Sequence, residues 1–307
     1  DVRLNTFAKS LAFNTKKGSF VKDKEIAGDL WVSFSKAQNK ISVNTTNLEI
    51  GKDLFNIKAN FNVGKGNSLF DIDIQTKIKW SNASNLLSNN ISSKLNKFDL
   101  KAPLLATCVI KGDMSVKGDP EITVNAIIKN DELMTSYGAV ENCSFNGKFT
   151  NNYKNGLGFN DANSAVIITE FQGDYKEIPI NIPSAIINNL EKPVATGDLH
   201  SKFEVENLGN VFGDEFIKFN GGTANVDLKF NVNIVDLRIS KPHFTGKVNI
   251  EKANMLLRSK NLTFQTNILL DFTDEALFIR NIKYQRDKNI FFLDGRINNF
   301  LNLYYDD

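Results

Sequence analysis

The feature that most constrains this chain is the alternation of apolar and polar residues from Phe70 to Trp80. Side chains on a β-strand point to opposite faces with a period of two residues. One face therefore carries Phe70, Ile72, Ile74, Ile78 and Trp80, and the other carries Asp71, Asp73, Gln75, Lys77 and Lys79. A sheet built from such strands has one apolar face, and the function depends on what covers that face.

The same alternation recurs along most of the sequence, whereas helical periodicity is rare. It is clearest in residues 222–234 and 260–272. Stretches rich in Gly and Asn, such as 64–67 and 220–222, separate the segments and have the composition of turns. The strand-like segments are 28–36, 39–46, 53–63, 68–80, 104–111, 121–129, 142–150, 164–172, 197–206, 222–234, 244–251, 260–272, 276–284 and 288–298.

These patterns predict a mainly β fold. We expect a long curved antiparallel β-sheet, as a groove or a half-open barrel, with a few short flanking helices. A β-sandwich is the alternative. The chain is expected to be a fragment of a longer protein, with an N-terminal β group in residues 1–100 and a larger antiparallel group in residues 101–307 that continues the same sheet.

Three segments are the candidates for the short helices. The best is amphipathic and lies near 82–98, where Leu87, Ile91 and Leu95 recur at helical spacing. Residues 183–190 form a shorter apolar turn, and residues 208–219 are the third candidate. None is long enough to form a helical layer over a sheet.

Charge and cysteine content exclude some classes of protein. The 307 residues carry 37 basic and 35 acidic side chains, so no bulk positive field favours nucleic acid. The two cysteines, Cys108 and Cys143, are too few for a disulfide scaffold, and the sequence leaves open whether they are bridged. The abundance of Asn, together with Lys and Ile, indicates an AT-rich bacterial genome.

Residues that could support catalysis are scarce. The two histidines, His200 and His243, lack partners at metal-ligand spacing. Nucleophile-elbow, P-loop and dinucleotide-binding patterns are absent from the sequence. Asp71 and Asp73 share a strand face with lysines, which fits a solvated surface better than a carboxylate pair. The sequence therefore predicts no enzyme, no cofactor and no metal site.

The apolar face, in contrast, demands an explanation. Burial of one Val, Leu, Ile or Phe contributes about 1.5–3 kcal/mol, so ten such side chains left in water would forgo roughly 15–30 kcal/mol. A typical domain is stable by only about 5–15 kcal/mol. The cover could be a second sheet, closure into a barrel, or an apolar ligand such as acyl chains.

Several short motifs, taken in order, resemble a known family. The first are Gly28-Asp29-Leu30-Trp31-Val32-Ser33-Phe34 and the predicted helix with Leu86, Leu87 and Ile91. Then come Gly118-Asp119-Pro120-Glu121-Ile122, residues 142–151, residues 186–193 and the closing Phe292-Leu293-Asp294-Gly295-Arg296-Ile297-Asn298-Asn299-Phe300-Leu301. This succession resembles the periplasmic part of AsmA-like proteins of Bacteroidetes-type bacteria.

The resemblance implies a bridge-type lipid transfer protein of the Gram-negative cell envelope. Such a parent would be anchored in the inner membrane by a segment outside this fragment, and its body would lie in the periplasm. Its curved sheet would carry phospholipid acyl chains between the inner and outer membranes and support outer membrane biogenesis and envelope integrity. The family has no catalytic motif to carry over.

The leading prediction is therefore non-enzymatic lipid handling, with phospholipid or another acyl lipid as the partner. The alternative is a structural or adhesive β-sandwich domain of a secreted or surface protein. The predicted lining of the lipid-binding groove is Phe55, Ile57, Phe61, Phe70, Ile72, Ile74, Val226, Leu228, Phe230, Phe264, Ile268 and Leu270.

Overall fold

The computed structural model describes residues 1–11, 21–64, 66, 68–84, 95–114, 119–235, 238–240 and 243–298. Within these residues, nineteen strands belong to one antiparallel sheet, accompanied by a few short helices. The predicted mainly β fold with a large antiparallel sheet and few short helices is confirmed. The chain divides into two compact units.

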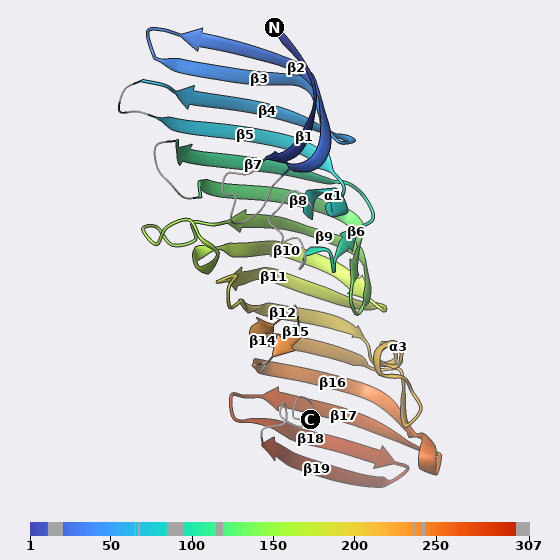
Figure 1. The fold of residues 1–307 in the computed structure, drawn as a ribbon. Helices are drawn as coiled ribbons and strands as arrows, with labels where there is room; N and C mark the ends of the chain where they lie inside the picture. The colour runs from blue at the N-terminus through green and yellow to red at the C-terminus, as the bar shows by residue number, and fades with distance from the viewer. Residues whose placement is uncertain are drawn as a thin grey trace. The chain divides into compact units, whose positions relative to one another are not determined.

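The first unit comprises residues 1–138, 145–167 and 188–191. The predicted division between residues 100 and 101 lies inside this unit. Its elements are β1 (Val2–Leu11), β2 (Val21–Ser35), β3 (Lys40–Ile50), β4 (Asp53–Asn62), β5 (Leu69–Ile78), α1 (Trp80–Ser84), β6 (Asp99–Leu100), β7 (Leu104–Asp113) and β8 (Glu121–Thr135). Figure 1 shows β2, β3, β4, β5, β7 and β8 side by side, as their antiparallel pairing requires.

Three strands and one short helix follow, and the strands contribute residues to both units. They are β9 (Gly138–Thr150), the 3₁₀ helix η1 (Asp161–Asn163), β10 (Ala165–Tyr175) and β11 (Ile178–Asn188).

The second unit comprises residues 139–144, 168–187 and 192–307. Its further elements are β12 (Val194–Glu204), η2 (Val205–Asn207), α3 (Leu208–Phe212), β13 (Ile217–Asn220), β14 (Thr223–Val235), β15 (Arg238–Ser240), β16 (Phe244–Leu257), η3 (Arg258–Lys260), β17 (Leu262–Phe272), β18 (Ala276–Arg286) and β19 (Asn289–Asn298). Strand β14 pairs with β12 on one side and β16 on the other, and β17, β18 and β19 continue the meander.

Bulges interrupt the strands in both units and increase their local bend. In the first unit the pairing register shifts between Ala27 and Asp29 of β2 and between Asn44 and Leu48 of β3. In the second unit it shifts between Ile250 and Ala253 of β16. Asn47 lies at the β3 bulge with a φ of 52°, a left-handed conformation that Asn adopts more readily than most residues.

The three predicted helices have different outcomes. The one near 82–98 falls mostly outside the described residues. The described part at its start belongs to α1, which covers Trp80–Ser84. Residues 183–190 belong largely to β11, so that helix prediction was wrong. The segment 208–219 forms α3 at its start and β13 near its end, because Gly213, with a φ of 74°, ends the helix.

Each unit has its own apolar core. In the first unit the core includes Ile26, Phe55, Ile78 and Leu104, and Trp80 of α1 packs against it. In the second unit Val205, Ala224, Ile250 and Ala253 form the cluster. Both cores consist of side chains from one face of the sheet together with residues from bends and short helices.

Candidate functional site

The predicted lining residues of the first unit lie on one face of β4 and β5. Phe61 pairs with Phe70 and Ile57 pairs with Ile74. The rings of Phe61 and Phe70 are stacked with centroids 6.2 Å apart. Paired residues of antiparallel strands project to the same side, so these side chains form rows across the strands.

The rows continue into strands for which the sequence analysis named no lining residue. Ile72 pairs with Ile110 of β7, which pairs with Ile122 of β8. Ile74 pairs with Cys108, which pairs with Val124. The alternation in residues 104–111 contained this information, but small residues such as Ala106 and Cys108 make the apolar stripe less conspicuous.

Burial along this face changes from one end of the strands to the other. At one end, which we call the covered end, lie Ile26, Leu48, Phe55, Ile78 and Leu104, each at most 9% exposed. The covered end is the core of the first unit. The bent start of β2 and helix α1 supply its cover, through Val21 and Trp80.

We call the opposite end the open end. Phe61, Phe70 and Ile72 are only half-buried there. On β2, Val32 is 47% and Phe34 is 60% exposed. The rows that contain these residues are as apolar as those of the covered end. Their cover is least complete on β2, whereas Ala59 and Ile110, which pair with Ile72, are still only 6% and 7% exposed.

Cys108 lies in the row between the two ends. It is half-buried, and neither Cys108 nor Cys143 forms a disulfide. Burial raises the pKa of the Cys108 thiol from 9.0 to about 11, because the thiolate would lose its hydration. The shift reports a weakly hydrated environment on the apolar face.

The second unit carries an equivalent face. Val226 of β14 pairs with Val248 of β16, which pairs with Leu270 of β17. In the next row, Ile250 joins Ala224 to Ile268. The predicted residues on β14 and β17 are therefore connected through β16, whose contribution the sequence analysis did not name.

Two further predicted residues of the second unit, Phe264 and Leu228, lie beside neighbours on adjacent strands. Phe264 pairs with Met255, and its ring meets the edge of Tyr284 at 5.7 Å. Leu228 pairs with Leu199 and Gly246.

Two phenylalanine rings on these faces lie over glycines of neighbouring strands. A Cβ atom added to Gly112 would lie 2.7 Å from Cζ of Phe70. A Cβ added to Gly197 would lie 2.6 Å from Cζ of Phe230. The missing side chains allow the rings to lie along the sheet instead of standing away from it.

Of the twelve predicted lining residues, eleven are half-buried and Phe55 is part of the core. Phe55 lies at the covered end, where it pairs with Leu48. Phe55 follows Leu54, whereas Phe61 stands between Asn60 and Asn62, but this local difference does not report which of the two rings is covered.

Part of the opposite face of the first unit, on β3, β4 and β5, is hydrogen-bonded and polar, whereas Leu54, Leu105 and Ile127 are exposed elsewhere on that face. Ser42 donates to Asn60 Oδ1 (2.8 Å), and Asn60 Nδ2 donates to Asp71 Oδ2 (3.0 Å). These bonds form a ladder across three strands on the solvent side. Asp71 therefore serves as a surface acceptor.

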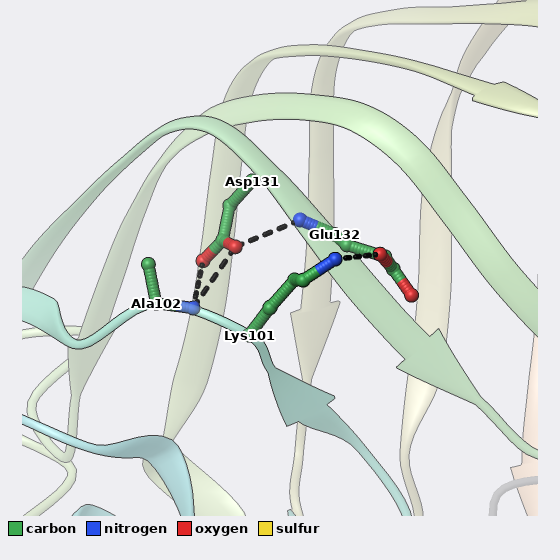
Figure 2. A network of polar contacts seen from close by, with 4 residues as sticks. All are labelled: Lys101, Ala102, Asp131 and Glu132. Carbon is green, nitrogen blue, oxygen red and sulfur yellow. Dashed lines mark hydrogen bonds and ion pairs between the residues drawn. The ribbon is translucent and has the colours of Figure 1, made fainter.

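A polar network fixes the turn that leads into β7 (Figure 2). The Asp131 carboxylate accepts from the backbone N–H of Ala102 at 3.0 and 3.2 Å and from that of Glu132 at 2.8 Å. The Lys101 ammonium reaches Glu132 Oε2 at 3.0 Å. Asn130, with a φ of 46°, precedes this site. The network holds the turn against the bend in β8, close to the covered end.

A separate hollow of about 630 Å³ lies beside α3 and β13 in the second unit. Phe212 and Phe216 at this hollow are 75% and 79% exposed. Glu206, Glu215 and Asp214 also line it. Arg258 forms an ion pair with Asp214 at 2.9 Å. The hollow contains none of the predicted lining residues.

The exposed area is large for a protein of this mass. The chain exposes 19240 Å². A compact protein of 34.4 kDa is expected to expose about 13,000 Å², and two separate compact bodies of half that mass about 15,600 Å² together.

The described part of the chain offers little for metal chemistry or membrane spanning. Among these residues, no group of three or more His, Cys, Asp and Glu is placed to hold a metal ion. No helix found there has the length and apolar character needed to cross a membrane. Comparisons with family models, curated proteins and solved structures gave no match.

Proposed function

We propose that this protein binds acyl lipid along the apolar face of its sheet and handles that lipid without catalysing a reaction. The observation that carries the proposal is the open end, where apolar rows continue from the core. There Val32 and Phe34 are exposed, and Phe61 and Phe70 are only half-buried. Exposed apolar surface of this kind marks a binding surface for an apolar partner.

The chemistry of the face supports a lipid chain over a polar ligand. On β4, β5 and β7, the face carries mainly Ile, Phe, Ala, Leu, Thr and Gly. Its ionisable residues are Cys108 and, at the covered end, Asp53, which accepts a hydrogen bond from Asn82. Such a surface gives an acyl chain a continuous contact without a specific polar anchor. It also leaves the polar headgroup free to remain in water.

The wider role proposed here is transport of phospholipid across the periplasm. It rests on the resemblance of residues 28–34, 142–151 and 292–301 to AsmA-like proteins. In this role the chain would be part of a bridge-type lipid transfer protein whose parent is anchored in the inner membrane. Lipid would then pass toward the outer membrane and sustain the cell envelope.

The test is lipid analysis of protein purified without detergent. Native mass spectrometry and organic extraction are expected to detect co-purified phospholipid. Ile72→Asp places a carboxylate at the open end, and Leu228→Asp does so in the second unit. Both are expected to reduce bound lipid severalfold while the circular dichroism spectrum remains that of a β protein.

Leu105→Asp is the matched control. Leu105 lies on β7, 59% exposed, on the opposite face from Cys108. The control introduces the same charge on the same sheet and is expected to retain lipid. Complete absence of lipid from the native protein, or equal loss in Leu105→Asp and Ile72→Asp, would refute the proposal.

A further inference from the structure

The loop between β9 and β10 presents an exposed apolar tip on a closely hydrogen-bonded base. Residues 151–164, which we call the Asn loop, project beyond the strand ends at the left of Figure 1. Residues 153–159, which we call the tip, are seven consecutive exposed residues. Within the tip, Leu157 is 61% exposed, and Tyr153 and Phe159 are each 37% exposed.

One buried asparagine organises the loop. Asn163 is 5% exposed. Its Nδ2 donates to the carbonyl oxygens of Lys154 (3.0 Å) and Gly158 (2.7 Å), and its Oδ1 accepts from the N–H of Lys154 (2.9 Å). Its backbone N–H donates to Oδ1 of Asn160 at 2.9 Å. The polar groups of this asparagine are thus bonded within the loop.

The base of the loop is fixed equally well. Asn151 is 6% exposed, accepts from the N–H of Ile122 at 2.7 Å and donates to the carbonyl oxygen of Pro120 at 2.8 Å. The N–H of Leu190 donates to the carbonyl oxygen of Asp161 at 2.9 Å. These hydrogen bonds fix the base of the loop, so the apolar side chains of the tip stay exposed to solvent.

From this geometry we propose that the tip is a membrane contact, which inserts Leu157 and Phe159 into the interfacial region of a lipid bilayer. The inference rests on the proposed lipid function and names its partner as a lipid surface. Lys154 is the only charged residue of the tip, and it can reach anionic headgroups while its stem stays apolar. Tyr153 suits the same interface, because its ring is apolar and its hydroxyl is polar.

A bilayer fits this tip better than a protein partner does. A stable protein interface buries about 1,200–2,000 Å² in total. A projecting tip of seven residues with three apolar side chains supplies only a small part of that area. Insertion into lipid needs only a few apolar side chains, because the bilayer deforms around them.

The experiment is flotation of the full chain with vesicles of mixed phosphatidylcholine and phosphatidylglycerol. The native chain is expected to float with the vesicles. Leu157→Asp and the double variant Leu157→Asp/Phe159→Asp are expected to lower the vesicle-bound fraction at least about tenfold, since each replaces an inserted apolar group by a charge. Leu105→Asp, at a site 59% exposed on the sheet, is the matched control and is expected to float like the native chain.

A second readout locates the tip directly. In Leu157→Trp, the new indole is expected to shift its emission to the blue on vesicles and to be quenched by brominated acyl chains. Undiminished flotation of the double variant, a water-like emission of the new indole on vesicles, or failure of the native chain to float would overturn the membrane contact. The membrane contact would also be overturned if the native chain self-associated without binding vesicles and Leu157→Asp abolished the self-association. That outcome would indicate a protein contact.

Lipid extraction from the same preparations separates this inference from the function on which it rests. A chain that carries lipid but floats equally with Leu157→Asp keeps the proposed function and loses the membrane contact. A chain that floats through its tip but carries no lipid keeps the contact and loses the proposed function.

Discussion

The covered end and the open end of the first unit consist of the same strands with the same alternation, yet they differ in what lies against them. Ile78, at the covered end, is 2% exposed and faces the core. Ile72, six residues earlier on the same strand and the same face, is half-buried. The apolar and polar pattern of the strands therefore does not determine which end is covered. The bends and short elements that lie over one end determine it.

This difference suggests a division of labour within one sheet. The covered end supplies the burial that keeps the unit folded, while the open end is free to meet a ligand. Substitutions at equivalent positions of the two ends should then affect different properties, and each comparison below tests that separation.

The largest effect is expected for a buried charge at the covered end. Ile78→Asp removes a fully buried side chain and places a carboxylate in the core, which should lower the free energy of unfolding by about 4 kcal/mol or more. Ile72→Asp should cost about 1–2 kcal/mol, because its carboxylate can reach water. Urea denaturation measures both. Equal losses would mean that the whole face is one continuous core.

A smaller contrast is expected for two glycines. A Cβ on Gly28 would lie 2.7 Å from the Cα of Leu48, a backbone atom that cannot move alone, so Gly28→Ala should cost about 2–3 kcal/mol. At the open end, a Cβ on Gly112 meets the tip of the Phe70 ring, which can rotate away. Gly112→Ala should cost about 1 kcal/mol. Thermal unfolding would contradict this prediction if Gly112→Ala were the more damaging.

The sequence predicted most of the long strands, with β1 and β11 as exceptions, but it did not predict their cover. Each of the fourteen predicted segments overlaps a strand, because alternation reports directly on sheet faces. Strand β11 was missed because Pro183 was interpreted as the start of a short apolar turn. Pro179 and Pro183 are four residues apart in this strand, so their missing donors fall on the same side of the strand and spare the ladder on the other side.

The bends were harder to foresee than the strands. The abundance of Asn was attributed to genome composition, but half of the twelve non-glycine residues with positive φ among the described residues are Asn. Asn47 and Asn130 are two of them, each in a bent strand. No local signal distinguishes them from the many Asn residues on polar faces, and the position of the covered end depends on such bends.

The polar network in Figure 2 should contribute less than the core does. Asp131→Ala removes the acceptor for the backbone N–H groups of Ala102 and Glu132 and should cost about 1–2 kcal/mol. Glu132→Ala breaks only an exposed ion pair with Lys101 and should cost well under about 1 kcal/mol. Hydrogen exchange should show faster opening of the Ala102 amide in Asp131→Ala alone. Equal exchange in both variants would contradict a role for Asp131 in holding the turn.

The smallest effect on stability, and the most direct report on the open end, is expected from Cys108. Its pKa, raised from 9.0 to about 11, keeps the thiol protonated, so at pH 8 iodoacetamide should alkylate it about 100-fold more slowly than an unperturbed cysteine. Peptide mapping distinguishes Cys108 from Cys143, which is 0% exposed.

The pH dependence of Cys108 follows from the same shift. The folded state holds this proton more tightly than the unfolded state, so its stabilising contribution is complete below pH 9 and is lost as the pH rises toward 11. Alkylation should accelerate over that range, and removal of bound lipid should accelerate it further at any pH. Rapid alkylation at pH 8 that lipid does not slow would show that water reaches Cys108. The apolar face would then be hydrated, and this result would contradict the binding of an acyl chain there.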